Sequence, residues 1–518
     1  MGDAVRFARS ALWRAKVARR GALVAVLTTV GALVSPVTAF AEQAPVTVPA
    51  IRQWTTGTGS YTFAPGARVV AVPSLAGVAA TFAADLRSLT GIPVEAVTGG
   101  EARPGDLELR LGDISAPPEG YRLTVGRAVL VEAASGDGVF AGTRTVLQWL
   151  RQRHTLPAGT AADWPEYPER GLMVDAGRRF LSLPWLRARI RAMAYFKLNY
   201  LHFHLSDVEG FRLESTSHPE IVSPQHYTKA EITDLIAYAA RYHVQVVPEI
   251  DMPGHMTPIL AAHPGLRLST PDGKTRDGFI DLGRPASYDL MRELLTEYLP
   301  LFPSRYWHIG ADEYVTDYDA YPQLAEYARA HYGPDATGKD AYHGFVNWAD
   351  DLVRAAGKTT RMWNDGLEPG GATVTVHPDI VVEHWSASGA FGLPWTGPAF
   401  TARQLAEAGH RVANAAFTPT YFTTGGAGSL FNADPAAMYD RWNPGKFVDG
   451  TTLSGPANLG SKVHLWCDDP KAYTEDQLGE ILHDRLAVLA QQTWGSAKPA
   501  ALYVVFLPRI AAVGTAPE

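Results

Sequence analysis

The chain has 518 residues, of which 46% are hydrophobic and 19% are charged. A chain of this length and composition can bury more than one core, which excludes disorder as its general state. Its formal net charge of −7 makes it a poor candidate for binding nucleic acid or anionic membranes.

The first 41 residues differ in composition from the rest. They carry six basic residues and Asp3, and an apolar run of 14 residues spans Gly21 to Val34. Ala39-Phe40-Ala41 then places small residues where a signal peptidase reads them. This order predicts a signal peptide over residues 1–41 and a secreted, extracellular protein. Its removal would take the net charge from −7 to −12, because the segment itself carries +5.

Residues 42–165 are predicted to form a small α+β domain without a catalytic role. Short β-like runs at 67–72, 107–111 and 121–125 are separated by Gly and Pro turns. Residues 75–90 and 138–151 have apolar side chains at helical spacing. The single cysteine, Cys467, excludes an internal disulfide framework and is predicted to be a small buried apolar residue.

Residues 166–518 are predicted to form a (β/α)₈ barrel, an α/β fold. Short apolar strand candidates alternate with amphipathic stretches, of which 183–196 and 229–243 are the clearest helices. The eight candidates lie at 171–175, 198–205, 244–250, 306–309, 360–363, 380–385, 412–417 and 463–466. A doubly wound sheet is the alternative, but the first strand is not followed by a Gly-rich phosphate loop.

Reactive side chains follow the predicted strands, as they do at the C-terminal face of a barrel. The strongest local signal is the acidic pair Asp312-Glu313 after an apolar strand, where small Gly310 and Ala311 would leave room for a ligand. Neighbouring Cα atoms are only about 3.8 Å apart. Such a pair is awkward for an acid and a nucleophile on opposite sides of a glycosidic bond.

A substrate-assisted mechanism suits adjacent acids better. One acid protonates the leaving oxygen, while the other holds an N-acetyl group whose carbonyl oxygen attacks the anomeric carbon. Aromatic walls would enclose that group, and Trp363, Trp385 and Trp466 stand at three predicted strand ends. This pattern favours a sugar pocket over three core residues.

Four blocks in order resemble glycoside hydrolase family 20 over about residues 45–500. They are Arg170-Gly-Leu-Met-Val-Asp175, Lys197-Leu-Asn-Tyr-Leu-His-Phe-His-Leu-Ser-Asp207, Val247-Pro-Glu-Ile-Asp-Met-Pro-Gly-His255 and His308-Ile-Gly-Ala-Asp-Glu313. The first unit is similar to the small domain that precedes the barrel in that family. The resemblance implies a retaining exo-glycosidase that removes β-linked N-acetylhexosamine from oligosaccharides or glycoconjugates through an oxazolinium intermediate, without a metal or other cofactor.

The resemblance also implies residue roles. Glu313 would be the general acid and then the base, and Asp312 would accept the acetamido N–H. Tyr421 would donate to the acetamido oxygen, and Asp207 with His255 would form a buried relay that orients Glu313. The sugar would be bound in the main subsite by a further set of residues: Arg170, Trp363, Trp385, Trp466 and Asp468.

Some positions depart from the family pattern. Thr423 stands two residues after Tyr421, where the family has an acidic residue, and Ala311 replaces a common glycine. The Gly-Ala-Asp-Glu-Tyr form resembles the lacto-N-biosidase branch, which releases galactose-β-1,3-N-acetylglucosamine. Loss of a residue that grips a hydroxyl would widen the site as that activity requires, so disaccharide release stays open beside the commoner hexosaminidase activity.

Two readings from other classes are also considered. His202-Phe-His204 on one strand would begin the site of a metal-dependent amidohydrolase, but the further ligands are not evident in the sequence. A carbohydrate-binding protein without catalysis would use the tryptophans equally well, yet it would not need the acidic pair.

Overall fold

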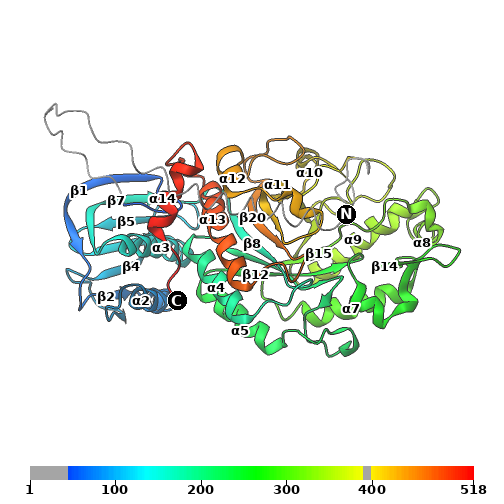
Figure 1. Ribbon diagram of the computed structural model, residues 1–518, viewed down its shortest axis with the longest axis horizontal. Helices are drawn as coiled ribbons and strands as arrows, with labels where there is room; N and C mark the ends of the chain where they lie inside the picture. Colours follow the sequence, from blue (N-terminus) through cyan, green and yellow to red (C-terminus); the bar gives the residue numbers. More distant parts are fainter. Residues whose placement is uncertain (1–44, 389–397) are drawn as a thin grey trace, which may run out of the picture. The chain divides into compact units, whose positions relative to one another are not determined.

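The computed structural model describes residues 45–388 and 398–518. The predicted signal peptide at residues 1–41 lies outside these ranges. The main architecture consists of a seven-stranded mixed sheet near the N-terminus and a closed barrel of eight parallel strands (Figure 1). The prediction of a (β/α)₈ barrel preceded by a small α+β domain is therefore confirmed.

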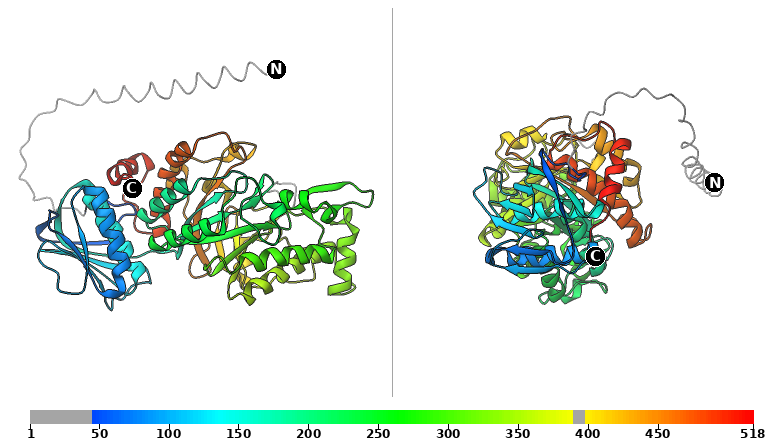
Figure 2. Two further views of the ribbon diagram at one scale, coloured as in Figure 1. Left: turned by 90° about the horizontal axis from the view of Figure 1, so that it is seen from below. Right: turned by 90° about the vertical axis from the view of Figure 1, so that its left-hand side faces the viewer.

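The small domain is built on one sheet in the order β1-β7-β5-β6-β4-β2-β3. Helices α2 (Ala76–Thr90) and α3 (Gly136–Gln152) pack on this sheet and against each other (Figure 2). The strands are β1 (Gln53–Thr62), β2 (Arg68–Ala71), β3 (Glu95–Thr98), β4 (Leu107–Leu111), β5 (Tyr121–Val125), β6 (Val129–Ala133) and β7 (Thr155–Asp163). Both helices and the strands β2, β4 and β5 lie where the sequence predicts them.

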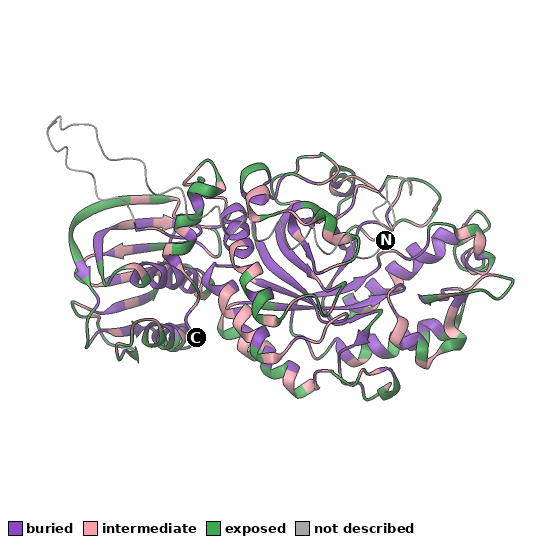
Figure 3. Ribbon diagram, in the orientation of Figure 1, coloured by how far each residue is buried: buried purple, intermediate pink, exposed green. Residues whose placement is uncertain are grey.

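The barrel strands are mostly buried, as Figure 3 shows for the centre of the molecule. In chain order they are β8 (Glu169–Asp175), β9 (Tyr200–His204), β12 (Gln245–Met252), β15 (Tyr306–Gly310), β16 (Thr359–Trp363), β17 (Val381–His384), β18 (Val412–Asn414) and β20 (Asn458–Trp466). Each overlaps a predicted strand. Neighbours pair in parallel, and the pairing of β18 with β20 closes the barrel. A short strand, β19 (Tyr421–Thr423), adds to the side of β20.

Helices follow most of the barrel strands and cover them from outside. The longer ones are α4 (Leu183–Tyr195), α5 (Lys229–Arg241), α7 (Pro285–Tyr298), α8 (Pro322–Tyr332), α9 (Gly338–Ala355) and α13 (Glu475–Trp494), with the short α10 (Ala402–Glu407) and α12 (Pro435–Arg441). Several of them begin at a side-chain cap: at α5, Thr228 and Glu231 form a reciprocal capping box. Residues 364–380, between β16 and β17, contain no helix. A last helix, α14 (Tyr503–Val513), packs on α3 and α12.

Two residues in the left-handed conformation join the barrel to the small domain. Lys197 (φ 61°) and His243 (φ 55°) follow the ends of α4 and α5. The Lys197 ammonium lies 2.9 Å from the Tyr121 hydroxyl and 3.2 Å from Asp163 Oδ2, which are both in the small domain. Lys197, Tyr121 and Asp163 are all buried, so these contacts join the barrel to the sheet of the small domain out of reach of water.

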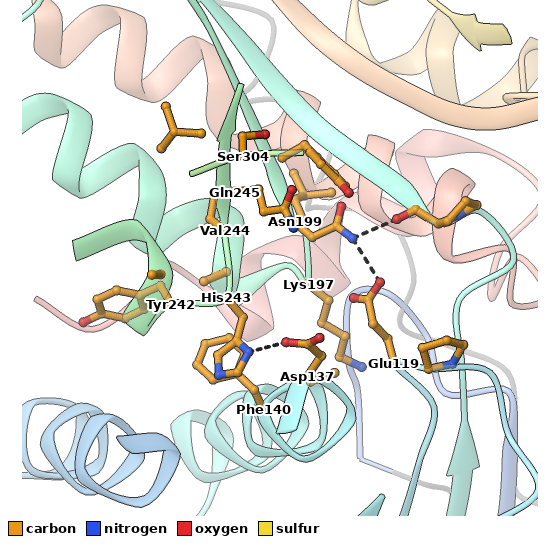
Figure 4. A pocket seen from close by; sticks show the side chains of 18 of the residues that line it. Glu119, Asp137, Phe140, Lys197, Asn199, Tyr242, His243, Val244, Gln245 and Ser304 are labelled. Atoms are coloured by element: carbon orange, nitrogen blue, oxygen red, sulfur yellow. Dashed lines mark hydrogen bonds and ion pairs between the residues drawn. The ribbon is translucent and has the colours of Figure 1, made fainter. Parts of the chain in front are cut away.

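A cavity of about 540 Å³ lies beside this seam, at the N-terminal ends of barrel strands. Figure 4 shows two contacts in its wall: His243 with Asp137, and Asn199 with Glu119. The cavity is at the opposite end of the strands from the acidic pair predicted for catalysis. Within residues 45–388 and 398–518, every helix is too short or too polar to cross a bilayer.

Candidate active site

The acidic pair lies at the C-terminal end of β15, on a turn with unusual backbone geometry. Gly310, Ala311 and Glu313 all have positive φ angles, of 71°, 69° and 53°. A Cβ atom at Gly310 would lie 1.7 Å from Asp251 Oδ1, so this position requires glycine for packing and not for ligand access as predicted. The strained turn directs Asp312 and Glu313 away from the strand, and such strain is concentrated at functional sites.

His255 connects the pair to Asp207. Its Nδ1 lies 3.0 Å from Asp207 Oδ1, and its Nε2 lies 3.6 Å from Asp312 Oδ2 and 3.4 Å from Glu313 Oε2. Asp207 is buried, whereas the Glu313 side chain is 28% exposed. The structure thus brings together these four residues, which the sequence predicts to be catalytic. The geometry places one imidazole nitrogen between the two acids.

The charges around His255 are strongly coupled because several carboxyl groups share one imidazole. Although burial disfavours its cation, Asp207, Asp312 and Asp251 raise the pKa of His255 well above its usual value. Burial raises the pKa of Asp312, against the opposing effect of His255. Burial and the neighbouring Asp312 raise the pKa of Asp251 well above its usual range. Burial of these neighbouring carboxyl groups therefore favours the neutral form of Asp251.

Asp365 fixes the backbone of the acidic turn, a role that the sequence does not reveal. Its Oδ2 accepts a hydrogen bond from the Glu313 backbone N–H at 2.7 Å, and its Oδ1 accepts from the Trp385 indole N–H at 2.8 Å. Asp365 therefore sets the position of the acid relative to an aromatic wall. The sequence indicates only that Asp365 lies two residues after a barrel strand, and so at the face of the site; its contacts become known from the structure.

Three partly buried rings form that wall. Trp385 and Tyr421 stack with centroids 6.4 Å apart and an interplanar angle of 16°, and Tyr421 is 5.8 Å from Trp466. Trp363 lies beneath them: it is 1% exposed, its centroid is 5.9 Å from Trp466, and its indole N–H donates to Glu249. The predicted aromatic box is thus three walls above a buried floor.

Arg178 is a site residue that the sequence analysis missed. Its guanidinium lies 2.9 Å from Asp207 Oδ2 and 3.0 Å from Asp175 Oδ2, and it stacks 5.1 Å above the Trp466 ring. Asp468 follows β20 and is partly exposed to solvent; the desolvation of its carboxyl group raises its pKa, although Arg178 opposes this. Arg178 follows β8 by three residues, so the rule that sites follow barrel strands could have found it.

The role predicted for Arg170 is wrong. Arg170 stands at the start of β8, at the N-terminal end of the barrel, and its side chain is fully buried. Its guanidinium donates to Glu119 of the small domain and to the backbone carbonyl groups of Lys197 and Tyr167. The side chain is therefore a tie between domains and is separated from the acidic pair by the length of the strand.

The His202-x-His204 pair points into the barrel, as alternation along a strand requires. His202 Nε2 and His204 Nδ1 both contact Glu249 Oε2, at 2.8 and 2.6 Å. His202, His308 and Glu383 each have one potential metal-ligand atom, and these three atoms lie within 4.8 Å of one another. The ammonium group of Lys462 lies 2.6 Å from Glu383 Oε1 and 3.1 Å from His202 Nδ1, and it already supplies positive charge there.

Comparisons with known proteins agree with this architecture. Residues 167–497 match the model of the glycosyl hydrolase family 20 catalytic domain, and residues 44–164 match domain 2 of the same family. A lacto-N-biosidase of Bifidobacterium bifidum is 33% identical over 88% of this chain, which spans 40% of that protein's length. A β-N-acetylhexosaminidase of Cellulomonas fimi is 29% identical, and the match covers 82% of this chain and 84% of the Cellulomonas protein.

A solved structure shares the fold over most of both chains. The crystal structure of a β-N-acetylhexosaminidase from Bacteroides fragilis superposes with a TM-score of 0.74 at 23% identity, covering 90% of this chain and 94% of that one. The catalytic-domain match spans the acidic pair, the relay and the aromatic wall together. The chain therefore belongs to glycosyl hydrolase family 20.

Proposed function

We propose that this glycoside hydrolase removes β-linked N-acetylhexosamine units from oligosaccharides or glycoconjugates by substrate-assisted catalysis. The observation that carries the proposal is the placement of Asp312 and Glu313 around one nitrogen of His255, at 3.6 and 3.4 Å. Two acids on one strand end are poorly placed to flank a glycosidic bond from opposite sides, which favours a nucleophile supplied by the substrate.

In the proposed reaction, Glu313 gives its proton to the glycosidic oxygen as the bond from that oxygen to the anomeric carbon breaks. The acetamido carbonyl oxygen of the same sugar forms a new bond to that carbon and gives an oxazolinium ion. Asp312 accepts the acetamido N–H, and the Tyr421 hydroxyl donates to the acetamido oxygen. Glu313 then takes a proton from a water molecule that opens the ring, which restores the acid and retains the anomeric configuration.

The aromatic wall supports this assignment. Trp385, Tyr421 and Trp466 form a cluster of partly buried rings, and Trp385 bonds Asp365, which also bonds the Glu313 backbone; such rings suit an acetamido methyl and would exclude water from the intermediate. The Asp365 contacts hold Trp385 and the Glu313 backbone in one rigid unit.

Two variants test the mechanism on chromogenic N-acetylglucosaminides. Glu313→Gln should lower kcat about 100-fold or more for a poor leaving group and far less for a dinitrophenyl leaving group, which needs no proton. Asp312→Asn should lower the rate on both substrates, because it weakens control of the acetamido group. Turnover of Asp312→Asn near that of wild type, or equal hydrolysis of the matching glucosides, would refute the assisted mechanism.

Release of a disaccharide, galactose-β-1,3-N-acetylglucosamine, is a second candidate activity. It is favoured by the 33% identity to a lacto-N-biosidase and by the neutral Thr423 on β19. A Cβ at Gly428 would lie 3.0 Å from Thr423 Cγ2 and 3.4 Å from Asp468 Oδ2, so a turn of small residues borders this side of the site. Mass analysis of the products from lacto-N-tetraose and from lacto-N-triose, which ends in N-acetylglucosamine, separates the activities. A disaccharide released from the tetraose supports the second activity. N-acetylglucosamine released from the triose, with the tetraose left intact because its terminal sugar is galactose, supports the first.

A further inference from the structure

A chain of alternating imidazole and carboxylate groups continues from the catalytic relay down into the barrel. His202 Nε2 lies 2.8 Å from Glu249 Oε2, which is also 2.6 Å from His204 Nδ1. His204 Nε2 lies 2.8 Å from Asp207 Oδ2, and Asp207 Oδ1 lies 3.0 Å from His255 Nδ1. From His202 to Asp207 every side chain is at most 1% exposed, so water does not compete for these contacts.

The contacts fix where the protons are. Both ring nitrogens of His204 face carboxylate oxygens, which accept only, so both nitrogens carry protons and the ring is an imidazolium. Although burial opposes the cation, Glu249 and Asp207 raise the pKa of His204 well above its usual value. His202 differs, because its Nδ1 accepts from Lys462, and burial and that ammonium group lower its pKa to about 3.

Titratable groups from several strands lie near the His204 ring. Glu249 and Asp251 come from β12, Asp207 from β10 (Ser206–Asp207), and Asp175 from β8, all with an oxygen near a His204 nitrogen. The Trp466 ring of β20 packs edge-on, 5.2 Å away. A cation at this place is therefore stabilised by the Glu249 and Asp207 carboxylates, both of which the His204 ring contacts directly.

His204 determines which oxygen of Asp207 serves the relay. Asp207 Oδ2 receives His204 Nε2–H and the Arg178 guanidinium, which leaves Oδ1 to accept from His255. With Nδ1 engaged in this way, His255 turns its Nε2 towards Glu313. Loss of the His204 contact would leave Asp207 held by Arg178 at Oδ2 and by the Val208 backbone N–H at Oδ1, at 2.9 and 2.6 Å, so the relay would lose one of the contacts that fix its direction.

We propose that His204 is a positioning residue for the catalytic acid: its imidazolium ties Asp207 to Glu249 and so sets the orientation of His255 and Glu313. The inference rests on the proposed role of Glu313 as general acid. Because His204 does not contact the reacting atoms, it acts only through Asp207.

A pair of substitutions separates positioning from general structural damage. His204→Gln places an amide N–H near the position of Nε2 and keeps a donor to Asp207, while His204→Asn keeps a donor near Nδ1 and loses that contact. Both variants are assayed with 4-methylumbelliferyl and dinitrophenyl N-acetylglucosaminides. On the 4-methylumbelliferyl substrate, which has the poorer leaving group, we expect kcat of His204→Asn to be about tenfold lower than that of His204→Gln. This difference is part of the rate that proton donation by Glu313 contributes. On the dinitrophenyl substrate the two variants should agree, and KM should change little.

His384→Phe is the matched control. His384 is a buried histidine at the end of β17 whose Nε2 contacts the Phe400 carbonyl at 3.2 Å and Asp449 at 3.4 Å, outside the chain of groups described above. It should leave the ratio between the two substrates at the wild-type value. Equal losses on both substrates for His204→Gln and His204→Asn would overturn the proposal, since that pattern indicates structural damage alone.

If the His204 variants do not fold, Glu249→Gln provides the second test, because it removes the charge that keeps His204 protonated. Its loss on the poor leaving group should exceed its loss on the dinitrophenyl substrate by about threefold or more; equal losses would refute the proposal. Glu313→Gln distinguishes the two levels of inference. If it shows no dependence on the leaving group, the assignment of the acid fails; if it does and the His204 and Glu249 variants do not, only the role of His204 fails.

Discussion

Two arginines only eight positions apart are predicted to have opposite roles, and exchanging each for methionine tests the assignment. Arg178 lies at the mouth of the barrel with its side chain 15% exposed, between Asp207 and Asp175. Arg170 is fully buried at the other end of the same strand. Methionine keeps much of the volume of either side chain and removes the charge and all of the hydrogen-bond donors.

The magnitude for Arg178 follows from the contacts that it can make with a bound sugar. A hydrogen bond to a charged group contributes about 1.5–3 kcal/mol, so loss of one such bond to a hydroxyl should lower kcat/KM about 10- to 150-fold. Arg178→Met also leaves two buried carboxylates less neutralised, so its stability should fall as well. The effect on kcat/KM, measured on folded enzyme with an N-acetylglucosaminide, is the result that counts.

Arg170→Met should behave differently. It deprives Glu119 of its bidentate partner and leaves two backbone carbonyl groups unpaired, which should lower the free energy of unfolding by about 1–3 kcal/mol. Since Glu119 is 20% exposed, water can recover part of this loss. The kcat/KM of the folded protein should stay within about twofold of wild type. Urea unfolding and steady-state kinetics measure the two quantities, and a large fall in kcat/KM for Arg170→Met without loss of stability would refute the reasoning.

Two further predictions concern stability and reactivity. Glu297 on α7 is bonded to Lys229 and to the Ser215–Ser217 turn, and these contacts hold its pKa well below the usual range although burial opposes this. Because the folded-state pKa is depressed, the stabilisation is complete above the unfolded pKa of about 4.3 and is lost as the pH falls through the folded value. Glu297→Gln should therefore unfold about 1–3 kcal/mol more easily in urea at neutral pH. The difference in unfolding free energy between wild type and Glu297→Gln should become smaller in acid. A difference that does not change with pH would contradict the assignment. Cys467 is fully buried, and burial raises its pKa well above the usual value. Iodoacetamide should label it only after unfolding, so rapid labelling of native protein would show that the site is open.

The order of elements could be predicted from the sequence because it depends on local patterns. Apolar runs bounded by turns predict the barrel strands, and helical spacing predicts α4 and α5, since both patterns reflect which side of an element faces the core. β1 could not be predicted in this way. Its sequence from Gln53 to Thr62 is rich in Thr and Gly and most of its residues are exposed, so it carries no alternation, and its pairing with β7 fixes its conformation.

The acidic pair and its relay could also be predicted, because each residue directly follows a barrel strand and belongs to a block of family-like sequence. The barrel brings strand ends together at one face, so residues as distant as Asp207, His255 and Glu313 must converge there. The three tryptophans follow the same rule, since Trp363 and Trp466 end barrel strands and Trp385 follows one, whereas Tyr421 on β19 was expected only from the family resemblance.

The tertiary structure alone decided which groups each side chain contacts and which charge those contacts favour. Arg170 lies at the start of β8 and Arg178 follows its end, and only the packed fold shows that Arg170 bonds Glu119 of the small domain while Arg178 bonds Asp207. The charge state of His204 likewise depends on two carboxylates that come from other segments of the chain. Such properties arise from distances across the fold and from burial, which a local sequence pattern does not contain.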